Sequence, residues 1–244
     1  MKKAAHKKVA VVMPAYNEEA RIGGVLKKLP SSVEVEGETY NLLPVVIDDK
    51  SQDNTARIAK KYGAHVIRHV VNTGAGGATR TGMKYVMELF AEDSSLIYMV
   101  TIDSDGQHDV SDIKHLISAA VKSDLDMVVG SRLHEGNKEN MPIHRIAGNV
   151  GLSLISRFLF GIKTKDTQSG LRLYSSKYLD KLSDYTIDRY GFCTETLWQA
   201  TRNGLKVEEV PIKVSYSAET LSKGQNNWGV VDLVKDLIWI RITR

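Results

Sequence analysis

Short apolar runs alternate with segments of helical periodicity through the first half of the chain. The runs predict strands at Val9–Met13, Leu43–Ile47, His65–His69, Leu96–Ile102 and Met127–Val129. The intervening patterns predict helices at 18–29, at 54–62, from the glycine-rich stretch 72–77 through 90, and from the N-cap residue Asp109. Strands that alternate with helices are typical of βαβ units, which build a parallel sheet.

The second half of the chain is less regular. Its pattern predicts helices at 142–160 and 192–203 and a pair of strands near 207–216. A last helical pattern, Val230–Ile242, mixes apolar residues with Asp232, Lys235 and Asp236. We therefore expect an α/β fold with a Rossmann-like, mostly parallel sheet flanked by helices and an amphipathic C-terminal helical appendage.

The composition is that of an ordinary folded protein. The 244 residues, 42% hydrophobic and 25% charged, suffice for one large domain or at most two small ones. Cys193 is the single cysteine, which excludes an intrachain disulfide and favours a reducing cytosol. We expect no signal peptide in the basic start 1–8, and no run reaches the roughly 18 apolar residues of a membrane span. The net charge of +4 fits a phosphate-bearing ligand or an anionic membrane as well as nucleic acid.

Polar residues gather where three of the predicted strands end. In open α/β sheets, ligands bind beyond the carboxyl ends of the strands. The segments at these positions are Pro14-Ala15-Tyr16-Asn17-Glu18, Asp48-Asp49-Lys50-Ser51 and Asp103-Ser104-Asp105-Gly106-Gln107-His108. Carboxylates from three strands are therefore expected to meet at one edge of the sheet.

The third of these segments suits a divalent cation. Asp103 and Asp105 are two positions apart on an extended chain, so both side chains leave the same face, and Gly106 lets the backbone turn. Two carboxylates are too few for an all-protein cage and suit Mg²⁺ or Mn²⁺ shared with a diphosphate. The structural alternative is a polar turn with an aspartate cap, and we interpret His108 as a turn residue beside the metal.

The second of these strand-end segments places two negative charges next to each other. Asp48 and Asp49 are adjacent acids that repel each other unless they have partners, and a nucleobase N–H or a ribose hydroxyl would be one. They could instead cap the next helix, although Asp53 is better placed for that role. The glycine-rich stretch 72–82 resembles a phosphate loop at a helix start but lacks the ending of a P-loop.

Two arginines flank the exit of the strand at Met127–Val129. Arg132 and Arg145 carry guanidinium groups that suit phosphate oxygens, so an anionic acceptor is expected there. The alternative for both is an ordinary solvated surface arginine. Cys193 is interpreted as a small hydrophobic core residue.

Five ordered motifs carry a family resemblance over roughly residues 9–216. They are the three strand-end segments, Gly130-Ser131-Arg132, and Asp166-Thr167-Gln168-Ser169-Gly170-Leu171-Arg172. Together they resemble family-two glycosyltransferases of the GT-A fold, specifically the polyprenyl-phosphate (dolichyl-phosphate) sugar transferases. Two positions depart from the family pattern: Lys50 stands where glycine or asparagine is common, and 215–227 lacks the usual arginine-rich pattern.

The resemblance implies transfer of one sugar from a nucleotide sugar to the phosphate of an isoprenoid lipid. UDP-glucose or UDP-N-acetylglucosamine is favoured as donor, and GDP-mannose stays possible. The implied nucleotide-binding residues are Pro14, Ala15, Tyr16, Glu18, Asp48, Asp49 and Asp103. The implied ligands of Mg²⁺ or Mn²⁺ are Asp103, Asp105 and Gln107, and the implied catalytic residues are Asp105, Arg132 and Arg145.

The expected mechanism follows from the acceptor's chemistry. A lipid monophosphate has its second pKa near about 6, so it is largely a dianion at neutral pH and can attack without a catalytic base. A metal would stabilise the departing nucleoside diphosphate. A single displacement would invert the anomeric centre and give a β-linked product from an α-linked donor.

The lipid substrate implies contact with a membrane. We expect a GT-A domain at 1–227 and an amphipathic membrane-interface helix at 228–244, with 150–162 as a second such helix. On one side of the last helix we expect Val230, Val234, Leu237, Ile238 and Arg241. Its alternative is a helix that packs on the core. The protein is expected in the cytoplasm, peripheral on the cytoplasmic face of a membrane.

Three other functions are weighed against this one. A sugar-phosphate nucleotidyltransferase needs a glycine-rich first loop with a basic residue, where this chain has Pro14–Glu18. A nucleic-acid binder would have clustered basic residues, and acids at three strand ends repel phosphates, so no nucleic-acid partner is expected. A glycosyltransferase acting on a hydroxyl needs a base, and no acidic motif clearly presents one.

Overall fold

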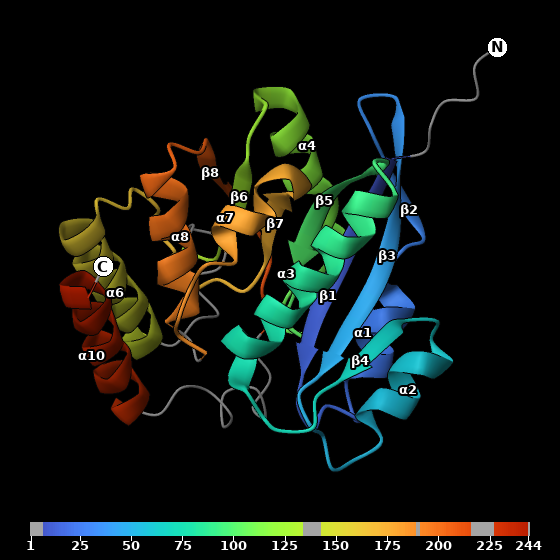
Figure 1. Ribbon diagram of the computed structural model, residues 1–244, viewed down its shortest axis with the longest axis horizontal. Helices are drawn as coiled ribbons and strands as arrows, with labels where there is room; N and C mark the ends of the chain where they lie inside the picture. Colours follow the sequence, from blue (N-terminus) through green and yellow to red (C-terminus); the bar gives the residue numbers. More distant parts are fainter. Residues whose placement is uncertain (1–6, 134–142, 189–190, 216–226, 244) are drawn as a thin grey trace.

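The protein is a mixed α/β structure (Figure 1). The computed structural model describes residues 7–133, 143–188, 191–215 and 227–243, with side chains from 147 in the helix that starts at 143 and at 234–242 in the last helix. The strands are β1 (Lys7–Ala15), β2 (Ser32–Val35), β3 (Glu38–Asp48), β4 (His65–Arg68), β5 (Leu96–Thr101), β6 (Met127–Ser131), β7 (Arg172–Ser175) and β8 (Val207–Pro211). The helices are α1 (Ile22–Lys28), α2 (Thr55–Lys61), α3 (Gly74–Glu92), α4 (Ile113–Ser123), α6 (Ile143–Phe160), α7 (Leu179–Leu182), α8 (Phe192–Arg202) and α10 (Asn227–Thr243), with short 3₁₀ turns at Val110–Asp112 and Ser176–Tyr178.

One 8-stranded sheet organises the fold, in the order β2-β3-β1-β5-β7-β6-β8 with β4 beside β3. The strands β4, β3, β1 and β5 pair in parallel, and so do β6 and β8. β2 is antiparallel to β3, and β7 lies antiparallel between β5 and β6. The prediction of a mostly parallel sheet is confirmed, and two antiparallel strands are added to it.

The predicted strands and helices of the first half are all present, with shifted ends. Asp109 accepts a hydrogen bond from the Ser111 amide at 2.9 Å and so caps the turn before α4, as expected. The prediction of a strand pair near 207–216 is wrong. β8 is a single strand that pairs with β6, and Val214 beyond it forms only an isolated bridge with His108.

Both faces of the sheet are covered by helices. Along β1, Val9 and Val11 pack with α1 and α4, whereas Ala10 and Val12 pack with α3 on the other face. Because both faces of β1 are buried, its apolar residues form an unbroken run instead of an alternating one. The sheet of the expected GT-A fold is therefore covered by packed apolar side chains on both faces.

The helices α6 and α10 lie side by side at the end of the molecule far from β2 and β3 (Figure 1). Leu237 and Ile240 of α10 are buried in the core, while Ile238, Trp239 and Ile242 are exposed. The prediction that Leu237 and Ile238 share one side is therefore wrong, because the helix turns one inward and the other to solvent. No helix in the described part of the chain is long and apolar enough to span a bilayer.

Candidate active site

The three strand-end segments meet at one edge of the sheet, as predicted. β1 lies between β3 and β5, and Ala15 is in register with Asp48. The Asp49 amide donates to the Ala15 carbonyl at 2.8 Å, and the Ser104 hydroxyl donates to the Pro14 carbonyl at 2.7 Å. These bonds join the ends of all three strands into one surface.

Asp103 and Asp105 stand on the open side of this surface. The Asp103 carboxylate is half exposed and lies 3.1 Å from His108 Nε2. Asp105 accepts hydrogen bonds from the Gln107 amide at 2.9 Å and from Gln107 Nε2 at 2.7 Å. Ser104 between them is buried, which agrees with the expectation that the two acids leave one face.

The two carboxyl groups have opposite pKa shifts. The pKa of Asp105 is raised, first by partial burial and then by the charge of Asp103. Partial burial also acts to raise the pKa of Asp103, but the bond to His108 and the charges of Arg132 and Arg172 prevail and lower it. Because the negative charge of Asp103 disfavours ionisation of Asp105, a cation bound between the two carboxylates would stabilise the state in which both are ionised.

The donor set fits a hard divalent cation that also binds substrate. Among the described residues, no cluster of three or more His, Cys, Asp or Glu side chains could hold a metal ion unaided. Asp103 and Asp105 offer carboxylate oxygens, which Mg²⁺ and Mn²⁺ prefer. The remaining ligands of such an ion would have to come from a diphosphate, from water or from the Gln107 amide oxygen.

Asp48 and Asp49 have internal partners that the sequence did not reveal. Asp48 is buried, accepts from the Ser51 amide at 2.9 Å and lies 3.1 Å from Arg68 Nε. Asp49 is also buried, and its carboxylate accepts from the amides of Thr73 and Gly74, both at 2.8 Å. The second acid therefore caps the N-terminus of α3, where a negative charge is favourable.

The glycine-rich stretch at the start of α3 does not form a phosphate loop. The amides of Gly76 and Gly77 donate to the Asp188 carbonyl at 2.8 and 3.3 Å. A Cβ on Gly76 would stand 2.6 Å from the Ile187 carbonyl oxygen, so glycine is needed for this close approach. The amides of Thr73 and Gly74 donate to Asp49, and those of Gly76 and Gly77 to Asp188, so the amides at the start of α3 already bind other parts of the chain.

The segment after β1 is fixed by the segment after β3. The Asn17 amide donates to Ser51 Oγ at 2.9 Å and the Glu18 amide to Thr55 Oγ1 at 2.8 Å, while Glu18 pairs with Arg21 at 2.8 Å. Tyr16 remains exposed beside this ordered backbone. Lys50 has φ +65°, a left-handed conformation that glycine and asparagine adopt more readily than lysine.

Arg132 is held by a partner that sequence reasoning missed. Its Nε and Nη2 donate to the two oxygens of Asp166 at 2.8 and 2.7 Å, and its amide donates to the same carboxylate. Asp166 is fully buried, and the charge of Arg132 helps to keep its pKa low against the effect of burial. The side chain of Arg145, the other predicted arginine, lies outside the described residues.

Arg172 is a second residue whose role was not predicted. It is fully buried and donates to the carbonyls of Thr167, Ser169 and Cys193 at 2.7–2.8 Å. These bonds fix the turn that brings Gly170 against Asp103, where a Cβ would lie 2.5 Å from the carboxylate oxygens. The signal was present in the motif that starts at Asp166, since a buried arginine needs several acceptors close by.

Comparisons with known proteins agree with this architecture. Residues 10–183 match the family described as "Glycosyl transferase family 2". The chain is 36% identical to the UDP-N-acetylglucosamine-dolichyl-phosphate N-acetylglucosaminyltransferase of Methanococcus voltae, over 91% of each protein, and 31% identical to the dolichyl-phosphate hexose transferase of Haloferax volcanii, over 84% of this chain and 81% of that one.

A solved structure shares the fold. Glucosyl-3-phosphoglycerate synthase from Mycobacterium tuberculosis, in complex with Mn²⁺, UDP and glucosyl-3-phosphoglycerate, superposes with a TM-score of 0.66 at 20% identity, over 97% of this chain and 80% of that one. The family match covers more than half of the chain and includes all three strand ends that carry the acids. The chain therefore belongs to glycosyl transferase family 2 and is a glycosyltransferase with a GT-A fold.

Proposed function

We propose that this glycosyltransferase moves one sugar from a nucleotide sugar to the phosphate of a polyprenyl or dolichyl phosphate. The observation that carries the proposal is the pair Asp103 and Asp105, which stand together at the joined ends of β1, β3 and β5 with the Asp103 carboxylate half exposed. The names of the relatives from Methanococcus voltae and Haloferax volcanii, both dolichyl-phosphate transferases, support the choice of acceptor.

The nucleotide would lie along the joined ends of β1, β3 and β5. Tyr16 offers an exposed aromatic ring to a base, and Glu18 a carboxylate fixed by Arg21. The set proposed to bind the nucleotide consists of Pro14, Ala15, Tyr16, Glu18, Asp48, Asp49 and Asp103. Since Asp48 and Asp49 already have protein partners, their contribution would be to shape the wall and to supply negative potential for N–H and O–H groups.

Asp103, Asp105 and Gln107 would hold Mg²⁺ or Mn²⁺ together with the diphosphate. A divalent ion supplies Lewis-acid stabilisation of the leaving diphosphate. The Mycobacterium tuberculosis structure with the same fold contains Mn²⁺ and UDP, which supports a divalent ion here. His108 would keep Asp103 oriented through the contact at 3.1 Å.

Arg132 and Arg145 would receive the acceptor phosphate. Arg132 is oriented by Asp166, so its guanidinium is in a fixed place before substrate arrives. The phosphate dianion would attack the anomeric carbon directly, break its bond to the diphosphate and invert its configuration, and no base is needed because the attacking oxygen carries no proton.

The donor is proposed to be UDP-N-acetylglucosamine or UDP-glucose in preference to GDP-mannose. The stretch Gly74–Gly82 looks like that of UDP-sugar users, and the name of the Methanococcus voltae relative states the N-acetylglucosamine donor. The protein would act as a peripheral protein on the cytoplasmic face of a membrane, with 1–227 as the catalytic part and 228–244 as an interface helix.

A panel of radiolabelled nucleotide sugars, each incubated with the purified protein, Mn²⁺ and a polyprenyl phosphate, tests the proposal. We expect label in the organic phase with UDP-N-acetylglucosamine or UDP-glucose. Matched reactions with a polyprenyl alcohol should give no product. Label transferred to the alcohol, or to a soluble sugar, would overturn the lipid-phosphate acceptor and favour a hydroxyl-directed enzyme.

A further inference from the structure

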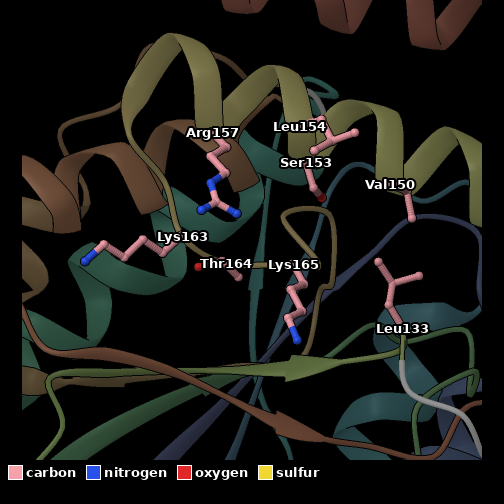
Figure 2. Close-up of a pocket in the computed structure, with 8 residues that line it drawn as sticks. All are labelled: Leu133, Val150, Ser153, Leu154, Arg157, Lys163, Thr164 and Lys165. Carbon is pink, nitrogen blue, oxygen red and sulfur yellow. The ribbon is translucent and has the colours of Figure 1, made fainter.

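The segment 165–167 connects α6 to β7 and belongs to neither a helix nor a strand. It carries Asp166, the buried acid that binds the guanidinium and the amide of Arg132. Figure 2 shows Lys165 and Leu133 beside a cavity of about 260 Å³ that also borders α6. Because the cavity leaves this side of the segment open, the hydrogen bonds of the segment decide where Asp166 lies.

Side chains from two neighbouring elements accept every backbone N–H of this segment. Glu209 of β8 accepts two adjacent ones, since the Lys165 amide donates to Oε2 and the Asp166 amide to Oε1, both at 2.8 Å. The Thr167 amide donates to Ser153 Oγ of α6 at 3.3 Å. Hydrogen bonds to a charged acceptor are about twice as strong as those between neutral groups, so the Glu209 carboxylate is the firmest of these restraints.

Glu209 itself stands on a strand of the central sheet. It is in register with Val129 of β6, the strand whose end leads directly to Arg132. Beyond Glu209, the Ile212 amide donates to the Ser131 carbonyl at 3.1 Å, so the pairing of the two strands continues past this position. A side chain that starts from a rigid strand can hold a functional group more precisely than one that starts from a loop.

A continuous series of hydrogen bonds thus connects β8 to the guanidinium of Arg132. Glu209 fixes the backbone of Asp166, and the Asp166 carboxylate accepts from Nε and Nη2 of Arg132 at 2.8 and 2.7 Å. We propose that Glu209 is a positioning residue for Arg132, which holds the guanidinium in the direction of the acceptor phosphate before the acceptor binds. This inference rests on the proposed function, to which the role of Arg132 toward the acceptor belongs.

Hydrogen exchange in the free protein tests the positioning without any substrate. In Glu209→Gln the side chain keeps its length but offers one oxygen, and its NH₂ group faces the other amide, so one of the two bonds is lost. The measured signal is the Nε–H of Arg132 in NMR spectra, identified by its absence in Arg132→Lys. We expect this Nε–H to exchange about 10-fold faster in Glu209→Gln, since one charge-assisted hydrogen bond corresponds to about a decade or more.

Steady-state kinetics with a polyprenyl phosphate measure the consequence for the reaction. We expect the acceptor KM of Glu209→Gln to rise about 10-fold with the donor KM unchanged, at the lower end of the range for partners that orient a functional group. A double-mutant cycle with Arg132→Lys follows. Because Glu209 acts through the guanidinium of Arg132, adding Glu209→Gln to Arg132→Lys should raise the acceptor KM by a much smaller factor.

Two matched controls separate positioning from charge and from stability. Glu208→Gln removes the same charge from the adjacent position of β8, where the side chain is exposed. Ile117→Val is a substitution in the core on α4 that lowers stability elsewhere. Both controls should keep the exchange rate of the Arg132 Nε–H and the acceptor KM of the unmodified chain. If circular dichroism shows that Glu209→Gln does not fold, Glu209→Asp, shorter by one methylene, takes its place with the same expected results.

Three results would overturn the positioning role of Glu209. They are unchanged exchange of the Arg132 Nε–H in Glu209→Gln, equally fast exchange in the controls, and the same rise of the acceptor KM with and without Arg132→Lys. Failure of the proposed function gives a different pattern. If the Nε–H exchanges faster and the donor KM rises while the acceptor KM is unchanged, Glu209 does position Arg132, but the arginine does not receive the acceptor phosphate.

Discussion

The two ends of this molecule satisfy their side chains in different ways. At the edge formed by β1, β3 and β5, the acids Asp48, Asp49 and Asp103 all have partners within the chain. At the end formed by α6 and α10, Phe158 and Trp239 are 90% and 65% exposed. The first region is organised before any ligand arrives, whereas the second exposes large apolar side chains among the described residues.

The two ends also differ in how precisely their proposed roles require atoms to be placed. Transfer of a sugar requires oxygens placed to a fraction of an ångström, which a network of short hydrogen bonds provides. Contact with a lipid surface requires apolar area and positive charge but no fixed geometry. Substitutions at the first end should therefore change rates and stability strongly, and substitutions at the outer surface of the second should change them little.

The largest effect is expected at the first end, from Asp105→Asn. Removal of one ligand charge weakens the proposed metal site, so turnover should fall by about two decades or more while the fold stays intact. Activity measured against increasing Mn²⁺ should show a raised metal requirement. Asp109→Asn, which removes one charge but keeps a hydrogen-bond acceptor at the cap of a 3₁₀ turn, is the matched control. Full turnover of the unmodified enzyme in excess chelator would contradict the metal site.

A large loss of stability is expected from Asp166→Asn, which removes the ion pair between Asp166 and Arg132. The variant leaves Arg132 without its buried counter-charge, and such changes cost about 3–5 kcal/mol. Denaturant unfolding at neutral pH measures the loss. The control is Asp93→Asn, whose exposed pair with Lys8 should contribute little.

The pH dependence of that loss has a definite sign. The pKa of Asp166 is lowered in the folded protein, so its contribution is present above the unfolded pKa of about 3.9 and disappears as pH falls toward the folded value. The stability difference between the unmodified chain and Asp166→Asn should therefore shrink below about pH 4. A difference that is constant over this range would show that Asp166 acts without its charge.

The next effect compares the two sides of α10. Leu237→Ala opens a cavity in the core and should cost about 2–5 kcal/mol. Trp239→Ala changes an exposed side chain and should stay within about 0.5 kcal/mol. Unfolding curves of the two variants decide whether this helix belongs to the core. Equal small losses would instead support a separate appendage, as the division into 1–227 and 228–244 predicts.

The sequence predicted those features whose cause is local. Unbroken apolar runs such as Val9–Met13 identify buried parallel strands, and acids directly after them identify the site edge, because both signals lie within a few residues. The sequence did not predict β7, because its first residue, Arg172, is of a type that usually lies at the surface. In the fold Arg172 is buried, and backbone carbonyls accept its hydrogen bonds.

The pattern of apolar and polar residues did not predict features that depend on partners far along the chain. Asp49 caps a helix that starts 25 residues later, and Glu209 binds the amide of Asp166 across 43 positions. The two sides of α10 were predicted wrongly for the same reason: apolar residues occur on all sides of this helix, so contact with α6 and α8 decides which side is buried.

The most specific of these effects is expected from Arg132→Lys. Alanine here would leave Asp166 buried without a cation, whereas lysine keeps the charge and removes only the two-pronged guanidinium. Loss of a charge-assisted hydrogen bond from the guanidinium to the acceptor phosphate should cost about 1.5–3 kcal/mol in binding, one to two decades in the acceptor KM, with the donor KM unchanged. Steady-state kinetics with each substrate varied in turn separate the two constants. Because Arg132 connects the ordered edge to the apolar end, a raised donor KM with an unchanged acceptor KM would assign this arginine to the nucleotide side and move the acceptor phosphate elsewhere.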